Sequence, residues 1–241
     1  MSKRLHVGTS GWHYKHWRGP FYPLNLGTDE MLAFYIQKFD SVEINNTFYR
    51  LPIPGALKNW RDSTPDSFDF SVKGSRYLTH MKKLKDPKPG LKNFFSRIRL
   101  LGKKLGPIVF QLPPRFECNP ERLHAFLKAL PAKHSYSFEF RDPSWHGREI
   151  YQLLERFNAA YCIYDLAGFQ SPIELTADFV YIRLHGPSGP YQGLYTKKSL
   201  AAWASRIRKW LETSKHVYIY FDNDQAGYAA QNALELKKLL K

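Results

Sequence analysis

Short apolar runs alternate with longer segments of helical periodicity along the whole chain, and this alternation predicts the fold. Eight runs have the length and the β-branched or aromatic content of strands. They are Leu5–Thr9, Ser41–Asn45, Phe68–Lys73, Pro107–Gln111, Tyr136–Phe140, Tyr161–Asp165, Phe179–His185 and Val217–Asp222. The predicted helices are Thr28–Phe39, Pro54–Asp62, Gly90–Lys104, Asn119–Leu130, His146–Phe157, Thr196–Glu212 and Ala226–Leu240.

Strand–helix alternation indicates parallel strands covered by helices. Eight strands in 241 residues favour a (β/α)8 TIM barrel of the α/β class, a fold of roughly 250 residues. The segment Leu166–Asp178 is short and polar, so we expect the sixth crossover to be short or irregular. No linker or low-complexity stretch interrupts the chain, which predicts a single domain over residues 1–241. Thr28 and Asp29 are expected to cap the first helix and Asn119 the fourth.

Side chains alternate between the two faces of a strand, and this sorts the polar residues. In the fifth strand the aromatic column must face the helices, which turns Glu139 and Arg141 into the barrel. The same sorting directs further polar side chains inward near the C-terminal strand ends: Glu43, Asn45, Lys73, Gln111, Asp165, Arg183, His185 and Asp222. TIM barrels carry their active sites at that end, the mouth, so a functional pocket is predicted there. The alternative is a set of ion pairs that only plugs the barrel, such as Lys73 with Glu43 or Arg183 with Asp165.

Charge points to a class of partner. The formal net charge is +15, which attracts polyanions, of which nucleic acid is the commonest, although a soluble lysine-rich surface has the same composition. The loop after the first strand, Gly11–Arg18, interleaves aromatic rings with cations, as a stacking and phosphate-binding surface does. The stretch Lys73–Lys92 holds seven Lys or Arg residues and one acid, Asp86. The loop Gly186–Tyr191 and the segment Asn223–Gly227 provide backbone N–H groups of the kind that bind anions.

A divalent metal is an open alternative to a metal-free acid–base site. The carboxylates at the mouth and His185 are ligand types that Mg, Mn or Zn accept. Lys73, Arg141 and Arg183 share the mouth and would neutralise much of that negative charge. A cluster of several zinc ions would also need His13, His16 or His80 to reach inward.

Seven motifs resemble those of the YecE-like family, TIM-barrel proteins of unknown function. In chain order they are Gly8–Trp12, Val42–Tyr49, Phe70–Lys73, Gln111–Pro113, Glu139–Arg141 with Ser144–Trp145, Arg183–Gly186 and Tyr220–Asp224. The resemblance covers nearly the whole chain. It implies the barrel and a mouth site with the inward residues named above, but no reaction.

These observations favour an enzyme of the hydrolase type that cleaves a phosphodiester or glycosidic bond in a phosphate-bearing substrate, most of all DNA or RNA. Candidate catalytic residues are Glu43, Lys73, Glu139, Asp165, His185 and Asp222, with Glu139 or Glu43 as general base and His185 as general acid. Candidate substrate-binding residues are Ser10, Trp12, Asn45, Gln111, Arg141, Trp145, Arg183 and Asn223. Two alternatives stay open: a sugar or sugar-phosphate isomerase or glycoside hydrolase, and a nucleic-acid-binding protein without catalysis.

The chain carries no sign of a membrane or secretory protein. No stretch approaches the ~20 consecutive apolar residues of a membrane span, and Met1–Val7 lacks the apolar run of a signal peptide. The two cysteines, Cys118 and Cys162, have no metal-binding spacing. A cytoplasmic location is therefore expected.

Overall fold

The computed structural model describes residues 5–213 and 215–241. Residues 1–4 and residue 214 lie outside the described part. The segment Met1–Val7, which the sequence analysis examined for a signal peptide, therefore lies only partly within it. Within that part, no helix is long and apolar enough to cross a membrane.

Eight parallel strands give the chain the fold class of a (β/α)8 TIM-like barrel, as predicted. They are β1 (Leu5–Thr9), β2 (Ser41–Ile44), β3 (Asp69–Lys73), β4 (Leu105–Gln111), β5 (Tyr136–Glu139), β6 (Ala160–Leu166), β8 (Phe179–Leu184) and β9 (His216–Phe221). Their order is β1-β9-β8-β6-β5-β4-β3-β2. A parallel bridge between Ser10 and Glu43 joins the two strands at the ends of this order.

The sixth crossover is irregular, as expected. A two-residue strand, β7 (Phe169–Gln170), pairs antiparallel with the end of β6. Ser171 then turns back, and its Oγ accepts a hydrogen bond from Tyr164 N at 2.9 Å. Between β6 and β8, the described residues contain no helix.

The helices lie where the pattern placed them, but their ends differ. They are α1 (Met31–Tyr35), α2 (Pro54–Asp62), α3 (Pro87–Ile98), α4 (Pro120–Ala129), α5 (Arg148–Arg156), α6 (Lys197–Glu212) and α7 (Tyr228–Leu239). The caps expected from Thr28 and Asp29 are wrong, because Glu30 holds the N-cap position and its carboxylate accepts from Gly27 N. The third helix ends at Ile98, and 3-10 turns around Gly102, at φ +61°, replace its predicted end. The cap by Asn119 is confirmed, with its side chain accepting from Arg122 N.

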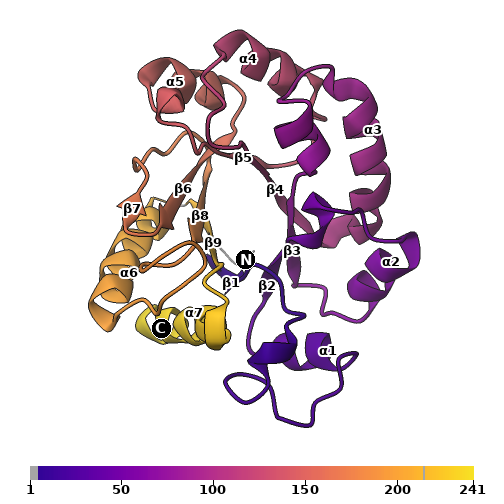
Figure 1. The fold of residues 1–241 in the computed structure, drawn as a ribbon, viewed down its shortest axis with the longest axis vertical. Coiled ribbons are helices and arrows are strands. Elements are labelled where there is room, and N and C mark those ends of the chain that lie inside the picture. Colours follow the sequence, from indigo (N-terminus) through magenta and orange to yellow (C-terminus); the bar gives the residue numbers. More distant parts are fainter. Residues whose placement is uncertain (1–4, 214) are drawn as a thin grey trace. The chain divides into compact units, whose positions relative to one another are not determined.

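Two compact units make up the chain. Unit 1 comprises Met1–Glu43, Ile163–Ile173 and Phe179–Lys241, and unit 2 comprises Ile44–Cys162 and Glu174–Asp178. In unit 1, α6 and α7 pack beside each other and against β9, and α7 also packs against β1 (Figure 1). In unit 2, α3 and α4 run along the side of β3, β4 and β5 (Figure 1). The prediction of a single domain stays a prediction.

The alternation of side chains along the strands is confirmed within each unit. In unit 2, the rings of Phe110 and Phe138 pack at 5.0 Å and 6.1 Å from Phe126 of α4, centroid to centroid. Glu139, one position after Phe138, therefore points to the opposite side, away from that helix. In unit 1, Tyr181 and Arg183 share the polar face of β8. Local strand geometry thus separates the apolar core from the polar columns.

Candidate functional site

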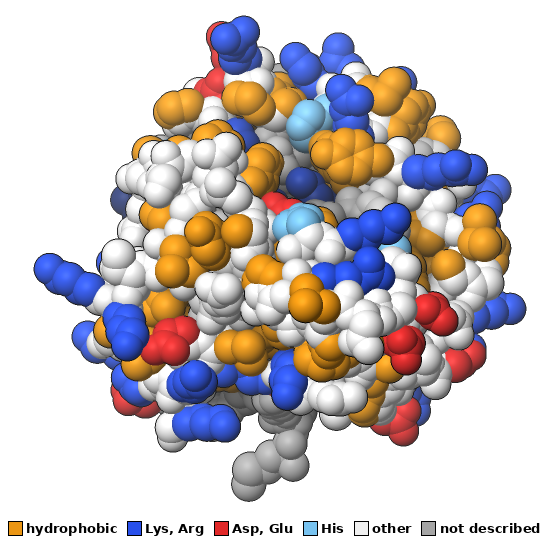
Figure 2. Space-filling view, turned by 60° about the horizontal axis from the view of Figure 1, so that its bottom comes forward, with side chains coloured by type: hydrophobic (Ala, Val, Ile, Leu, Met, Phe, Trp, Pro, Cys, Tyr) orange, Lys and Arg blue, Asp and Glu red, His pale blue; other side chains and the backbone are white. Residues whose placement is uncertain are grey.

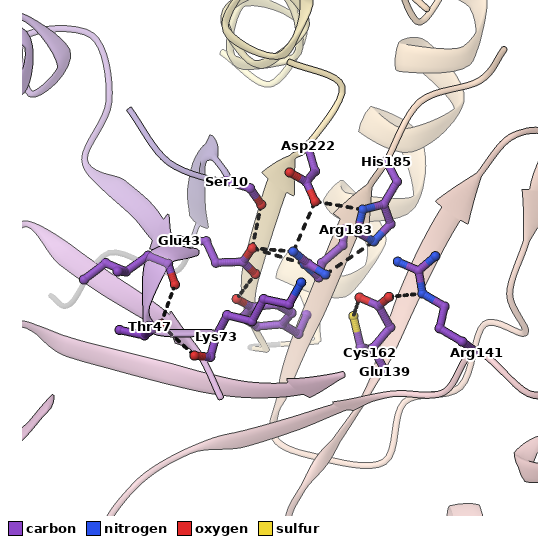
Figure 3. Close-up of polar contacts among 12 residues, drawn as sticks. Ser10, Glu43, Thr47, Lys73, Glu139, Arg141, Cys162, Arg183, His185 and Asp222 are labelled. Atoms are coloured by element: carbon purple, nitrogen blue, oxygen red, sulfur yellow. Dashed lines mark hydrogen bonds and ion pairs between the residues drawn. The ribbon is translucent and has the colours of Figure 1, made fainter. Parts of the chain in front are cut away.

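A fully buried ion pair forms the centre of the polar cluster in unit 1. Arg183 Nη2 lies 2.7 Å from Glu43 Oε1, and neither side chain is accessible to solvent. Glu43 also accepts from Arg183 Nε at 3.2 Å, from Ser10 Oγ at 2.5 Å and from Tyr181 Oη at 2.7 Å (Figure 3). The donors Ser10, Tyr181 and Arg183 fix Glu43 and the guanidinium together.

The close approach of β1 to β2 places Ser10 beside Glu43. Gly8 allows this approach, because a Cβ there would lie 2.2 Å from the carbonyl oxygen of Ser41. The residue after Ser10, Gly11, donates from its backbone N to Glu43 O at 2.8 Å. Below Glu43 on the same face of β2, Ser41 Oγ and Tyr220 Oη are 2.5 Å apart. A residue with a side chain at position 8 would push the two strands apart.

Asp222 and His185 extend the network from the ion pair. His185 Nδ1 lies 2.9 Å from Asp222 Oδ2, and Arg183 Nη2 lies 3.3 Å from the same oxygen. Arg183 Nη1 is 3.5 Å from His185 Nε2 (Figure 3). A neutral imidazole with its proton on Nδ1 satisfies both contacts, because Nε2 is then an acceptor. His185 is fully buried and Asp222 is 6 % exposed, so Asp222 is the member of this pair that a solute reaches.

Asp165 is half-buried at the end of β6 and is held by a tyrosine. Tyr195 Oη donates to Asp165 Oδ1 at 2.8 Å and accepts from Gly186 N at 2.9 Å. Burial raises the pKa of Asp165 above its ordinary value, and the hydrogen bond from Tyr195 opposes this shift. A partly accessible carboxyl with a raised pKa can exchange protons closer to neutral pH than an ordinary aspartate.

Tyr195 and Asn232 belong to this polar network, and the sequence analysis did not single them out. Asn232 is 3 % exposed on α7, and its side chain accepts from Tyr195 N at 3.0 Å and from Asn223 Nδ2 at 3.0 Å. Its Nδ2 donates to Tyr195 O at 3.1 Å. The signal in the sequence is a polar Asn among small apolar residues on the buried face of α7, Ala229, Ala233 and Leu236.

Unit 2 carries a second polar group at the ends of β3, β4 and β5. Glu139 is fully buried, pairs with Arg141 Nε and lies 3.9 Å from Cys162 Sγ (Figure 3). Lys73 Nζ lies 4.4 Å from the centroid of the Phe48 ring, a cation–π contact, and Lys73 O accepts from Thr47 Oγ1. Lys73 and Gln111 are each 8 % exposed. Unit 2 thus has two slightly exposed cations, Lys73 and Arg141, next to the polar side chains of Glu139 and Gln111.

His80 lies in the π-helical turn Tyr77–Met81, close enough to the cations of this group for them to lower its pKa. Burial and the cations Lys73, Arg76 and Arg141 lower its pKa to about 4. The ring packs edge-on against Phe48 at 4.9 Å, and Nδ1 lies 2.9 Å from Thr79 Oγ1. Burial is the main cause of the lowered pKa of His80, and the neighbouring cations Lys73, Arg76 and Arg141 lower it further.

Comparison with known proteins assigns nearly the whole chain to one family. Residues 6–241 match the family described as "Protein of unknown function DUF72". The chain belongs to this family. The resemblance to the YecE-like family is confirmed, because UPF0759 protein YecE of Escherichia coli is 31% identical over 63% of the chain and 54% of its own length. UPF0759 protein YunF of Bacillus subtilis is 25% identical over 98% of the chain and 94% of its own length.

Solved DUF72 structures agree with the fold. A DUF72 family protein of Thermotoga maritima superposes with a TM-score of 0.89, at 29% identity over 99% of both chains. A DUF72 family protein of Enterococcus faecalis gives a TM-score of 0.81 at 19% identity, covering 98% of this chain and 95% of its own. The family membership therefore agrees with the fold, and the function of the family is unknown.

Two of the predicted substrate-binding residues of this DUF72 chain, Trp145 and Asn223, are fully buried, whereas Trp12 is slightly exposed. Trp145 is fully buried, stacks on Phe140 at 4.9 Å and donates from Nε1 to Phe116 O at 2.5 Å. Trp12 is 7 % exposed, and Asn223 is fully buried beside Asn232. A ring without an accessible face cannot stack on a substrate, so the structure gives Trp145 a supporting role. Asn45 stays half-buried at the end of β2.

The structure assigns no metal centre. Within residues 5–213 and 215–241, no three His, Cys, Asp or Glu side chains are grouped so that they could hold a metal ion. In unit 1 the guanidinium of Arg183 stands between Glu43 and Asp222, where a cation would otherwise bridge the two carboxylates.

Each unit thus brings part of the predicted set together. In unit 1 the group comprises Ser10, Glu43, Arg183, His185 and Asp222, with Asp165 linked to it through the bond from His185 N to Asp165 O at 2.8 Å. In unit 2 the second polar group comprises the Glu139–Arg141 pair and the Lys73–Phe48 contact. The convergence of both groups in one pocket stays a prediction.

Proposed function

We propose that this protein is an enzyme of the hydrolase type that acts on a phosphate-bearing substrate, with nucleic acid as the favoured class. The observation that carries the proposal is the charged network of unit 1, in which Glu43, Arg183 and His185 are fully buried and Asp165 and Asp222 reach solvent. Buried ion pairs can be replaced by apolar residues with little loss of stability, so a network this extensive supports a chemical task.

Asp165 is the proposed general acid–base group. Its carboxyl is partly accessible, Tyr195 fixes its orientation, and its pKa is raised by burial. A group of this kind can remove a proton from an attacking water or return one to a leaving oxygen. Asp222, held by His185 and Arg183, is the second carboxylate of the proposed reaction.

Glu43 and Arg183 are assigned as positioning residues. Ser10, Tyr181 and Arg183 donate to Glu43, and its side chain is fully buried. A carboxylate in this environment is a poor general base, since a substrate would have to displace a protein donor. This assignment replaces the proposal, made from the sequence, that Glu43 removes a proton.

The cations favour an anionic substrate. Lys73 and Arg141 of unit 2 are each slightly exposed, and their positive field acts on His80. Lys and Arg side chains also outnumber Asp and Glu side chains over the surface seen in Figure 2. The full burial of Trp145 weighs against the carbohydrate alternative, because a buried ring cannot stack on a sugar.

The test is a cleavage assay on end-labelled oligonucleotides, single-stranded, double-stranded and containing an abasic site, with and without added Mg²⁺ or Mn²⁺. The expected result is cleavage that Asp165→Asn reduces by about 10²–10⁴-fold. The matched control is Asp178→Asn, which removes the same charge from an exposed position.

Two outcomes contradict the proposal. Binding without turnover of any oligonucleotide favours the non-catalytic nucleic-acid-binding protein. If neither binding nor cleavage is found, nucleic acid is the wrong class, and sugar phosphates become the substrates to screen.

A further inference from the structure

A basic hollow lies in unit 2 between the loops that follow β3 and β4. It has a volume of about 500 Å³. Its lining includes the cations Lys82, Lys83, Lys85, Arg115 and Arg122 and one acid, Glu117. Three of the cations, Lys83, Lys85 and Arg115, are exposed, so they reach solvent and any solute that enters. Like charges gathered around one cavity repel each other, and an anion between them removes that repulsion.

Two of the cations pack on one aromatic ring, that of Phe116. The Phe116 side chain is 4 % exposed, and both Lys83 Nζ and the Arg122 guanidinium lie 5.6 Å from its centroid. Because the ring is covered, it offers no stacking face to a base. The hollow therefore offers charged groups without an accessible ring of Phe116, and this arrangement suits a phosphate better than a nucleobase.

The loop after β4 is braced by the segment that follows β5. Trp145 Nε1 donates to Phe116 O at 2.5 Å, and Ser144 Oγ accepts from Cys118 N at 2.8 Å. Ser144 Oγ and N donate to the Asp142 carboxylate and lower its pKa, to which the Arg115 backbone N–H adds a smaller contribution. Three consecutive contacts thus fix the backbone on which Arg115 and Phe116 stand.

The loop after β3 is equally constrained. Leu84 is 1 % exposed and anchors the loop, and Leu84 N donates to Leu78 O at 2.9 Å. Lys83, Leu84 and Asp86 have left-handed φ values of 45°, 66° and 44°, as does Arg115 across the hollow at 60°. Such values are costly for residues with a Cβ and persist where the surrounding structure imposes them, often at ligand-binding segments.

We propose that this basic hollow binds consecutive phosphates of a nucleic-acid strand, through Lys82, Lys83 and Lys85 on one side and Arg115 and Arg122 on the other. The inference deepens the proposed function, and its choice of nucleic acid among the polyphosphates rests on that function. Cations on preorganised backbone bind phosphate without a further ordering cost, and they contribute affinity without sequence preference.

The experiment measures binding of a fluorescent oligo(dT) and of a mixed-sequence duplex at several salt concentrations between about 50 and about 200 mM, the range in which phosphate contacts lose most affinity. Each phosphate contact contributes about 0.7 for a single strand, or about 0.9 for a duplex, to the slope of log K against log salt. Lys82→Gln, Lys83→Gln and Lys85→Gln combined should lower the single-strand slope by about 2 and weaken binding to both sequences alike. Arg115→Gln alone should lower it by about 0.7.

The matched control replaces Lys197, Lys198 and Lys209, which are exposed residues of α6 in unit 1, by Gln. It removes the same three charges from residues that do not line the hollow, and it should leave the slope nearly unchanged. An equal loss in both triple variants means that the overall charge alone drives binding, and it overturns the inference. So does an unchanged slope in the hollow variant.

The outcome separates this inference from the proposed function. If the hollow variant loses binding while Asp165→Asn retains it and no oligonucleotide is cleaved, the hollow is confirmed and the hydrolase is wrong. If oligonucleotides are cleaved at equal rates by wild type and hollow variant below saturation, the hydrolase stands and the hollow is wrong.

Discussion

Arg183 and Glu43 form an ion pair in which Arg183 Nη2 lies 2.7 Å from Glu43 Oε1 and neither side chain reaches solvent. The same guanidinium nitrogen lies 3.3 Å from Asp222 Oδ2, so one arginine links two carboxylates from different strands. Charges removed from water are costly unless they are paired. The stability of unit 1 should therefore depend on the members of this network jointly.

Glu43→Gln should destabilise the protein by about 3–5 kcal/mol, because it leaves the buried Arg183 with one carboxylate instead of two. Combining it with Arg183→Met removes both charges, and the double variant should lose less than the sum of the two single variants. Urea unfolding of the four proteins measures this coupling. Additive losses would show that the pair contributes nothing as a pair.

Asp165→Asn should keep the fold, because the amide oxygen can still accept the hydrogen bond from Tyr195. The folded-state pKa of Asp165 is raised above its ordinary value of 3.8, so ionisation is less favourable in the fold than in the unfolded chain. The wild type then loses stability as pH rises from 3.8 through the raised pKa, and the variant does not. Near neutral pH, thermal melting should find the variant at least as stable as the wild type. A large loss would favour a purely structural role for this carboxylate.

His80 should remain neutral down to a pH of about 4, where its pKa lies because of burial and the neighbouring Lys73, Arg76 and Arg141. The unfolded chain takes up this proton near 6.5, so the folded state loses stability as pH falls from 6.5 to about 4. Following the imidazole resonances by NMR measures the titration directly. In Arg141→Gln the pKa of His80 should rise, because one of the cations that lower it is gone. An ordinary pKa in the wild type would contradict the positive field described for unit 2.

Trp145→Phe should destabilise unit 2 by about 1–3 kcal/mol, since it leaves the buried carbonyl oxygen of Phe116 without the indole donor. The phenyl ring still packs on Phe140, so the loss reports the hydrogen bond more than the packing. Hydrogen exchange should speed up at Phe116 and Cys118, the loop that Trp145 and Ser144 brace. The control Trp210→Phe, on α6 of unit 1, should leave exchange in that loop unchanged.

The sequence by itself determined the strand–helix order and the direction of side chains along each strand. Both depend on local properties: a strand turns successive side chains to opposite faces, and an apolar column packs against helices wherever these lie. This is why Glu139, Arg183 and Asp222 were assigned correctly to polar faces. Asn119 was likewise predicted as a helix cap, because capping involves only the next few residues.

Only the tertiary structure decided which polar groups meet. Arg183 with Asp165 was one example of the ion pairs considered for a plugged barrel, but Arg183 contacts Glu43, 140 residues away. Trp145 looked like a binding platform and became a brace for the Phe116 loop. Partner choice of this kind depends on the relative position of segments far apart in the chain, and that is set by packing that no local periodicity encodes.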